Sequence, residues 1–221
     1  MAICNAEDAV RRHEIIEQLS SDLEAVRPLA APWQGAALWG AAAWAIVLAL
    51  TLATGPLRAG ALSALGEHLR YTFEAFLGLA LGAVAIHSAL VLGVPGAARP
   101  FFRVAAVLAL AAAWMGAFVY GLWHPAFPPS MLGKRAHCMV ETYLFSLAPL
   151  LLGMIALRRR IALERAWAGA LVGAASAAIP AVVMQIACMY DPLHILVYHF
   201  TPVAALALAG ALAGVVALRR L

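Results

Sequence analysis

The sequence predicts an all-α polytopic membrane protein, in which a bundle of six transmembrane helices follows a short amphipathic helix outside the bilayer. First, 65% of the 221 residues are hydrophobic, only 12% are charged, and the mean hydropathy is +0.89. A soluble domain carries about 25% charged residues, so this chain has too few to cover a water-soluble globule. Second, the apolar residues form six runs of roughly 20, the length that a helix needs to cross a bilayer.

The chain divides into two predicted regions. Residues 1–32 form a cytoplasmic N-terminal segment that binds a partner, since they hold six acidic residues and lack the apolar core of a signal peptide. Residues 33–221 form the transmembrane domain. Its expected spans, each bounded by proline, glycine, cysteine, histidine or arginine residues, are about 36–54, 71–92, 102–123, 138–157, 166–188 and 195–218.

The N-terminal segment contains a predicted amphipathic helix over residues 6–27, which Asn5 can cap and Pro28 ends. Its apolar stripe has the spacing 3, 4, 3 and consists of Ile16, Leu19, Leu23 and Val26. A helix that lies on anionic lipid usually has a basic polar face. Because this one is mainly acidic, docking of a basic partner protein is as plausible as packing against the membrane or the bundle.

The positions of the basic residues predict the orientation of the bundle. The N-terminal segment, the loops at 93–103 and 158–165 and the C-terminus together hold 11 Lys and Arg, whereas the opposite side holds 4. Both termini are therefore expected in the cytoplasm. This distribution also explains the net charge of +4 without direct binding of nucleic acid. The strong preference for Arg over Lys, with abundant Ala and Gly, is typical of a GC-rich bacterial genome.

Three pairs of glycines have the GxxxG spacing that allows helices to pack closely. The pairs are Gly78/Gly82, Gly169/Gly173 and Gly210/Gly214. They are compatible with packing inside one bundle or with a homodimer, so the oligomeric state stays open.

Two cysteines, Cys138 and Cys188, are expected at similar depth on the outer, periplasmic side. Three interpretations remain: a structural disulfide, a thiol pair that senses oxidants or soft metal ions, or two small buried side chains without a shared role. Further ligands for a metal ion could come from nearby side chains, namely His137, Glu141, Asp191, His194 and His199. The chain has no CxxC or HExxH motif, so we expect no enzymatic activity and no required cofactor, and a heavy-metal ion would act as a signal.

Three stretches resemble the NrsF family of bacterial inner-membrane anti-sigma factors, the negative regulators of sigma-F-type extracytoplasmic-function (ECF) sigma factors. They are LSSDLEAVRPL (Leu19–Leu29), HCMVET (His137–Thr142) and QIACMYDPLHILVYH (Gln185–His199). The resemblance implies that the N-terminal region holds an ECF sigma factor at the membrane and that Cys138 and Cys188 carry stress sensing. The positions that match the sigma-binding motif are Leu19, Asp22, Leu23, Val26, Arg27 and Pro28, and Ile16 extends the same stripe.

The main alternative is a small transporter or channel for a metal ion, a proton or a solute. Its path would be lined by Glu74, Glu141, Gln185, His194 and His199. The polar residues gather at one end of the bundle and the middles of the helices are almost free of charge, which disfavours a continuous path. A membrane thiol or quinone oxidoreductase is disfavoured further, since the two outer cysteines are far apart in the sequence.

Overall fold

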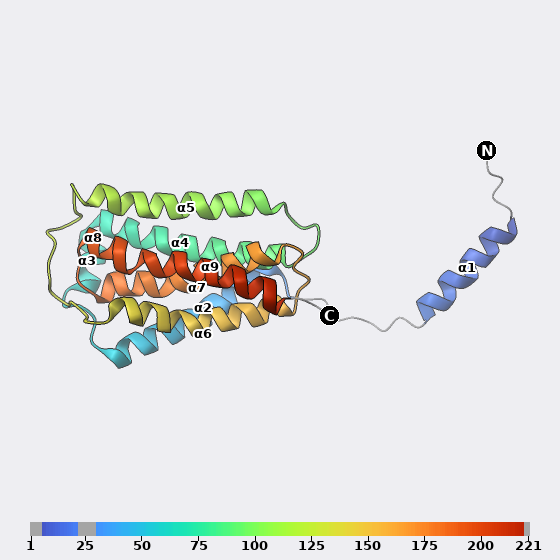
Figure 1. Ribbon diagram of the computed structural model, residues 1–221, viewed down its shortest axis with the longest axis horizontal. Helices are drawn as coiled ribbons and strands as arrows, with labels where there is room; N and C mark the ends of the chain where they lie inside the picture. The colour runs from blue at the N-terminus through green and yellow to red at the C-terminus, as the bar shows by residue number, and fades with distance from the viewer. Residues whose placement is uncertain (1–5, 22–29, 219–221) are drawn as a thin grey trace. The chain divides into compact units, whose positions relative to one another are not determined.

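The computed structural model describes residues 6–21 and 30–218. The chain separates into two compact units, residues 1–30 and residues 31–221. The first unit contains α1 (Ala6–Ser21; Figure 1). Ile15, Ile16 and Leu19 of this helix are exposed. The remaining residues assigned to the sigma-binding motif lie outside the described residues; they are Asp22, Leu23, Val26, Arg27 and Pro28.

The second unit is helical, and the part of it that the structure describes contains no strand. Its elements are α2 (Pro32–Thr54), α3 (Ala61–Glu67), α4 (Leu69–Leu92), α5 (Pro100–Gly121), α6 (Cys138–Arg158), α7 (Arg165–Ala187), α8 (Pro192–Tyr198) and α9 (Phe200–Ala217). Six spans are long and apolar enough to cross a membrane: α2, α4, α5, α6, α7, and α8 with α9. The predicted fold class, a bundle of six transmembrane helices, is confirmed, and the helix bounds differ from the expected ones by only a few residues.

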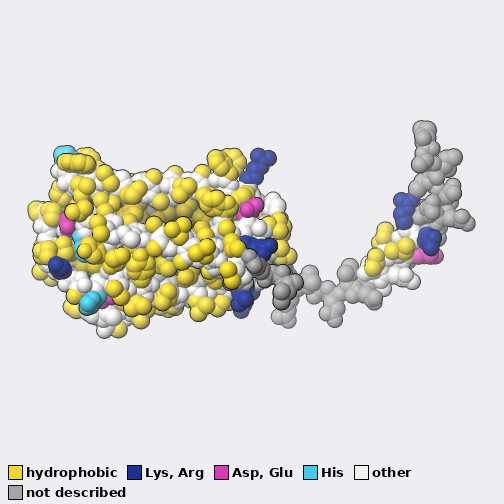
Figure 2. Space-filling model, in the orientation of Figure 1, with side chains coloured by type: hydrophobic (Ala, Val, Ile, Leu, Met, Phe, Trp, Pro, Cys, Tyr) yellow, Lys and Arg dark blue, Asp and Glu magenta, His cyan; other side chains and the backbone are white. Residues whose placement is uncertain are grey.

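The long helices of the bundle run side by side, and α7 forms its centre (Figure 1). Within the most apolar stretch of each span, 89% of α7 is buried, against 67% of α4 and only 17% of α5. The outer helices therefore present apolar side chains outwards. Hydrophobic side chains cover the middle of the bundle in Figure 2, while charged ones lie at its two ends. This distribution is the one that a bilayer requires, because lipid tails offer no partner to a charge.

The two ends of the bundle differ in charge. At one end, which we call the cysteine end, α2 and α5 finish and α6 begins at Cys138. Its Lys and Arg side chains are balanced by as many acids; the basic residues are Arg58, Arg70, Lys134 and Arg135, and the acids are Glu67, Glu74, Glu141 and Asp191. At the other end, the arginine end, one acid, Glu164, accompanies a larger basic group; its members are Arg99, Arg103, Arg158, Arg159, Arg160 and Arg165.

The glycine pairs of α7 and α9 pack against one another inside the bundle. A Cβ atom added at Gly169 or Gly173 would come closer than 3.0 Å to backbone atoms of α9, at Gly210 and Leu206 respectively. The clash is mutual, since a Cβ atom at Gly210 or Gly214 would meet the backbone of α7. These two GxxxG pairs therefore serve helix packing within one chain.

Candidate metal centre

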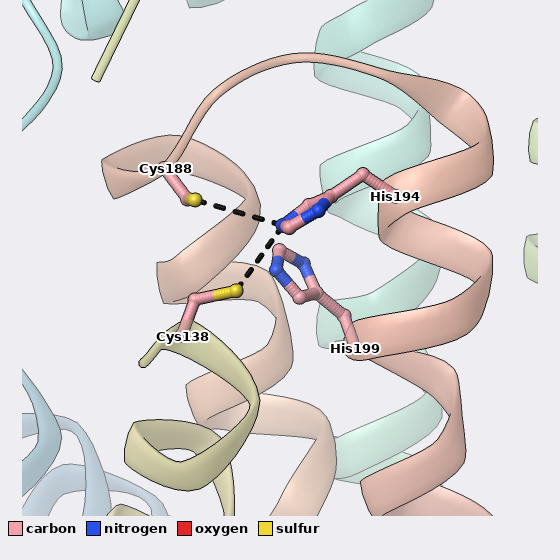
Figure 3. Close-up of side chains that lie close together, drawn as sticks. All are labelled: Cys138, Cys188, His194 and His199. Atoms are coloured by element: carbon pink, nitrogen blue, oxygen red, sulfur yellow. Dashed lines mark hydrogen bonds between the residues drawn. The ribbon is translucent and has the colours of Figure 1, made fainter. Parts of the chain in front are cut away.

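Four side chains from helices α6 and α8 and from the positions that follow α7 and precede α9 meet at the cysteine end, as Figure 3 shows. They are the thiols of Cys138 and Cys188 and the imidazoles of His194 and His199, and one potential ligand atom from each lies within 4.8 Å of all the others. The sequence placed both cysteines and both histidines among seven possible ligands. The structure selects these four as a single cluster.

Local structure explains how residues so far apart in the sequence converge. Cys138 is the first residue of α6, and Cys188 directly follows the last residue of α7. The chain then turns, and the Asp191 carboxylate accepts hydrogen bonds from the backbone N–H groups of Leu193 and His194, so that it caps α8. His194 lies in α8, and His199 occupies the break between α8 and α9.

The two thiols lie on either side of one imidazole. The Nε2 atom of His194 is 3.1 Å from Cys138 Sγ and 3.7 Å from Cys188 Sγ, and its tautomer decides which group donates. Both cysteines are free thiols and both are buried. The structure therefore contains no disulfide between them, although their sulfur atoms are close enough to share one ligand.

His199 is the least satisfied member of the cluster. Its side chain is 0% exposed, and neither ring nitrogen makes a hydrogen bond of normal geometry to the described residues, although the Cys188 thiol lies near enough to interact with it. Its ring meets that of His194 nearly at right angles, with 5.4 Å between the centroids. Leaving a buried polar group without a partner costs about 1–3 kcal/mol, so this imidazole requires an explanation.

A metal ion fits the donor set. Two thiolates and two imidazoles form a common tetrahedral site for Zn²⁺, with Zn–S bonds of about 2.3 Å and Zn–N bonds of about 2.0–2.1 Å. These bond lengths put the ligand atoms roughly 3.3–3.8 Å apart in a tetrahedron. The observed spacing within 4.8 Å therefore needs only small movements of the side chains. An ion would also give His199 the partner that it lacks.

The three other candidate ligands lie outside this cluster. The Glu141 carboxylate pairs with Arg135, with 2.7 Å between Oε2 and Nε. Asp191 is engaged in the cap of α8, and His137 is exposed just before α6. Arg135 also donates to the Thr54 hydroxyl at 2.6 Å, so it ties the start of α6 to the end of α2. Sequence analysis did not single out Arg135, because its partners are known only from the fold.

Tyr190 is a second residue that the sequence analysis did not identify. It lies between the ligands Cys188 and His194, and its ring stacks on Phe127 at 4.0 Å. Its hydroxyl accepts from the backbone N–H of Ala126 at 3.0 Å and donates to Glu74 Oε2 at 3.4 Å. Burial raises the pKa of Tyr190, so the hydroxyl keeps the proton that it donates. Tyr190 therefore fixes the loop that carries the cluster.

The acceptor of the Tyr190 hydroxyl, Glu74, is fully buried in α4 and forms an ion pair with Arg70, whose Nε is 3.2 Å from Oε1. Arg70 in turn donates to the Ala117 carbonyl of α5 at 3.0 Å. The loop after α7 is thereby connected to α4 and α5 through one carboxylate.

Replacing Tyr190 by Phe is expected to destabilise the bundle by about 1–3 kcal/mol. The substitution keeps the stacked ring but leaves Glu74 Oε2 and the Ala126 N–H without their partner. Thermal unfolding of the purified protein in detergent measures the effect. Tyr198→Phe is the matched control, since the structure records no hydrogen bond from that hydroxyl within the described residues. An equal effect of the two substitutions would contradict the role assigned to Tyr190.

Comparison with known proteins identifies the family. The chain matches the family model of NrsF, described as negative regulator of sigma F, over residues 19–219. No curated protein and no solved structure matches it. The matched region begins within α1, includes all six spans and contains all four residues of the cluster. The description implies a sigma factor as the partner. The chain therefore belongs to the NrsF family of negative regulators of sigma F.

Proposed function

We propose that this protein is an anti-sigma factor of the bacterial inner membrane that holds an ECF sigma factor at the cytoplasmic face and releases it on a periplasmic signal. The observation that carries the proposal is the exposed apolar side of α1, in a unit separate from the membrane bundle. Ile16 is 63% exposed and Leu19 is 68% exposed. The family match begins at Leu19, so it includes part of this helix.

The orientation of the bundle supports the assignment of sides. The arginine end carries more basic residues than the cysteine end, and basic residues favour the cytoplasm. With this orientation α2 begins, and the N-terminal unit emerges, on the side where a sigma factor is found. The cluster of Cys138, Cys188, His194 and His199 then lies at the periplasmic end.

The cluster supports a sensing role for Cys138 and Cys188. A thiophilic ion bound by the four side chains is the first candidate signal. The second is a two-electron oxidant such as hydrogen peroxide, which would take two electrons and two protons from the two thiols to form one S–S bond and would itself be reduced to two molecules of water. For either signal to release the sigma factor, the altered bundle must bind it more weakly. A shift from 99% to 1% occupancy requires about 5.5 kcal/mol of differential affinity.

Replacing Ile16 and Leu19 together by Glu is expected to weaken sigma-factor binding by roughly 100-fold or more. Each apolar side chain that enters an interface contributes about 1.5–3 kcal/mol, and a buried carboxylate opposes binding further. The measurement is retention of the sigma factor by the full-length protein in detergent or nanodiscs.

Gln18→Glu is the control for this double variant, because it adds negative charge to the same helix away from the apolar stripe. It should retain binding within a few-fold. Unchanged retention in the Ile16 and Leu19 variant would refute the docking element. Failure of the unsubstituted protein to retain any sigma factor would refute the proposed function itself.

A further inference from the structure

A pocket of about 290 Å³ opens at the arginine end, between the last turn of α6, the first turn of α7 and the end of α9. Cationic and apolar side chains share its lining, which consists of Arg158, Arg160, Ile161, Ala162, Leu163, Arg165, Ala217 and Leu218. None of these described lining residues is acidic. The nearby acid, Glu164, is exposed to the outside. The pocket therefore presents a strongly positive, partly apolar interior.

Contacts with backbone atoms position the side chains of two of the three arginines in the pocket. Arg158 Nε donates to the carbonyl of Ala217 at 3.2 Å, which fixes its guanidinium at the end of α9. The stem of Arg160 lies on Gly93, where a Cβ atom would come within 2.8 Å of its Cδ. Arg160 is only 7% exposed, and this burial lowers its pKa.

The start of α7 adds to the positive potential. This helix begins at Arg165, and the side chain of its preceding residue, Glu164, makes no capping hydrogen bond. The first N–H groups of a helix have no partner within the helix and carry a partial positive charge. With the arginines beside them, they form a setting suited to an anion such as phosphate.

The apolar part of the lining points to an amphiphile. Ile161 and Leu163 are exposed, and they lie in the short loop between the spans that end at Arg158 and begin at Arg165. This loop is at the depth where phospholipid headgroups meet the acyl chains. We propose that the pocket binds the phosphate of an anionic phospholipid headgroup, with the acyl chains lying along Ile161 and Leu163. Basic pockets between helices at the cytoplasmic face are typical of such recognition.

Arginines elsewhere at the arginine end make it possible to distinguish a specific phosphate site from a general attraction of anionic lipid. Arg99 and Arg103 belong to the same end of the bundle but do not line the pocket. Attraction of anionic lipid by overall charge would depend on them as much as on Arg158 and Arg165. Binding of a phosphate group in a specific pocket would instead depend on the arginines of the pocket alone.

The experiment uses the full-length protein in detergent and native mass spectrometry with phosphatidylglycerol, phosphatidylcholine or inorganic phosphate. We expect retained adducts of phosphatidylglycerol and at least tenfold less retention of phosphatidylcholine. The double variant Arg158→Gln, Arg165→Gln should lose at least tenfold in phosphatidylglycerol retention, and Arg99→Gln, Arg103→Gln should stay within twofold of the unsubstituted protein. Arg158→Lys, Arg165→Lys keeps the charge but not the planar fork, and should show intermediate retention.

Three results would overturn the proposal. The first is an equal loss of phosphatidylglycerol retention in the pocket and control variants, and the second is unchanged retention in the pocket variant. The third is displacement of the lipid by millimolar inorganic phosphate, which would indicate a site for the free anion. Circular dichroism without lipid checks folding. If the Gln variant is unfolded, the Lys variant decides the matter, and full retention there would also overturn the proposal.

Discussion

Replacing Cys188 by Ser is expected to lower the affinity of the proposed site for Zn²⁺ by more than about 100-fold, and His199→Leu is expected to have an effect of the same order. Loss of a group that merely orients a ligand already costs 10–100-fold in metal affinity, so the loss of a ligand exceeds that range. Both side chains are fully buried in the cluster, and no exposed group can replace them without rearrangement. The measurement is competition with a chelator, using the full-length protein in detergent and a Cys4→Ser background that removes the third thiol.

His124→Ala is the matched control, because His124 is an exposed histidine at the same end of the bundle. Its Zn²⁺ affinity should equal that of the background protein. The spectrum of bound Co²⁺ provides a second readout, since tetrahedral coordination by thiolates and imidazoles gives intense visible bands. Tight Zn²⁺ binding that survives Cys188→Ser and His199→Leu together would exclude the cluster as a metal site. In the proposed regulator, the same two substitutions should leave sigma-factor binding intact but remove its response to the ion.

Replacing Gly169 and Gly173 together by Ala destabilises the bundle by roughly 3 kcal/mol or more, enough to reduce the yield of folded protein sharply. Overpacking of a close contact costs about 1–3 kcal/mol at one site. Here the cost lies at the upper end, because the atoms that a new methyl group would meet belong to the α9 backbone, which cannot rotate away. Thermal unfolding in detergent and the amount of monodisperse protein measure the effect.

Gly40→Ala and Gly116→Ala provide controls of the same chemistry. A Cβ atom at either position would meet nothing within 4 Å. Alanine is the better helix former by about 0.8–1.0 kcal/mol, so these variants should be as stable as the unsubstituted protein or slightly more stable. If all four positions tolerate alanine equally, α7 and α9 are not in backbone contact.

The spans could be predicted because a membrane imposes a simple requirement on length and hydropathy, which each run meets by itself. The short helix α3 was not predicted, since seven residues with only two buried side chains leave no periodic signal. The role of the glycine pairs was also open, because spacing alone cannot tell an internal partner from another chain. For the pairs Gly169/Gly173 and Gly210/Gly214, only the position of α9 against α7 shows that they pack internally.

The cluster was predicted in part. The depth of Cys138 and Cys188 followed from their places at the ends of two spans. His194 and His199 could not be separated from the other candidates, because residues five apart on a continuous helix point about 140° away from each other. The chain breaks at His199, between α8 and α9, and this break turns both imidazoles toward the thiols. Glu141 lies one turn after Cys138 in α6, but its carboxylate is engaged by Arg135.

The close fit of α7 against α9 divides the cluster into a fixed part and a movable part. Cys188 directly follows α7 and His199 directly precedes α9, so two helices in close backbone contact carry these two side chains. Cys138 belongs to a different helix, α6. A contraction of the cluster is therefore expected to displace α6 more than α7 or α9.

Two hydrogen bonds connect α6 and the residues just before it to α2. The carbonyl of Pro149, in the middle of α6, accepts a hydrogen bond from Trp39 Nε1 of α2 at 2.9 Å. At the cysteine end, Arg135 joins the start of α6 to Thr54 of α2. These two hydrogen bonds join the helices in the first half of α2 and at its end, so a shift of α6 is expected to shift α2 with it. A displacement of α6 would therefore act on α2, the helix that follows the N-terminal unit in the sequence.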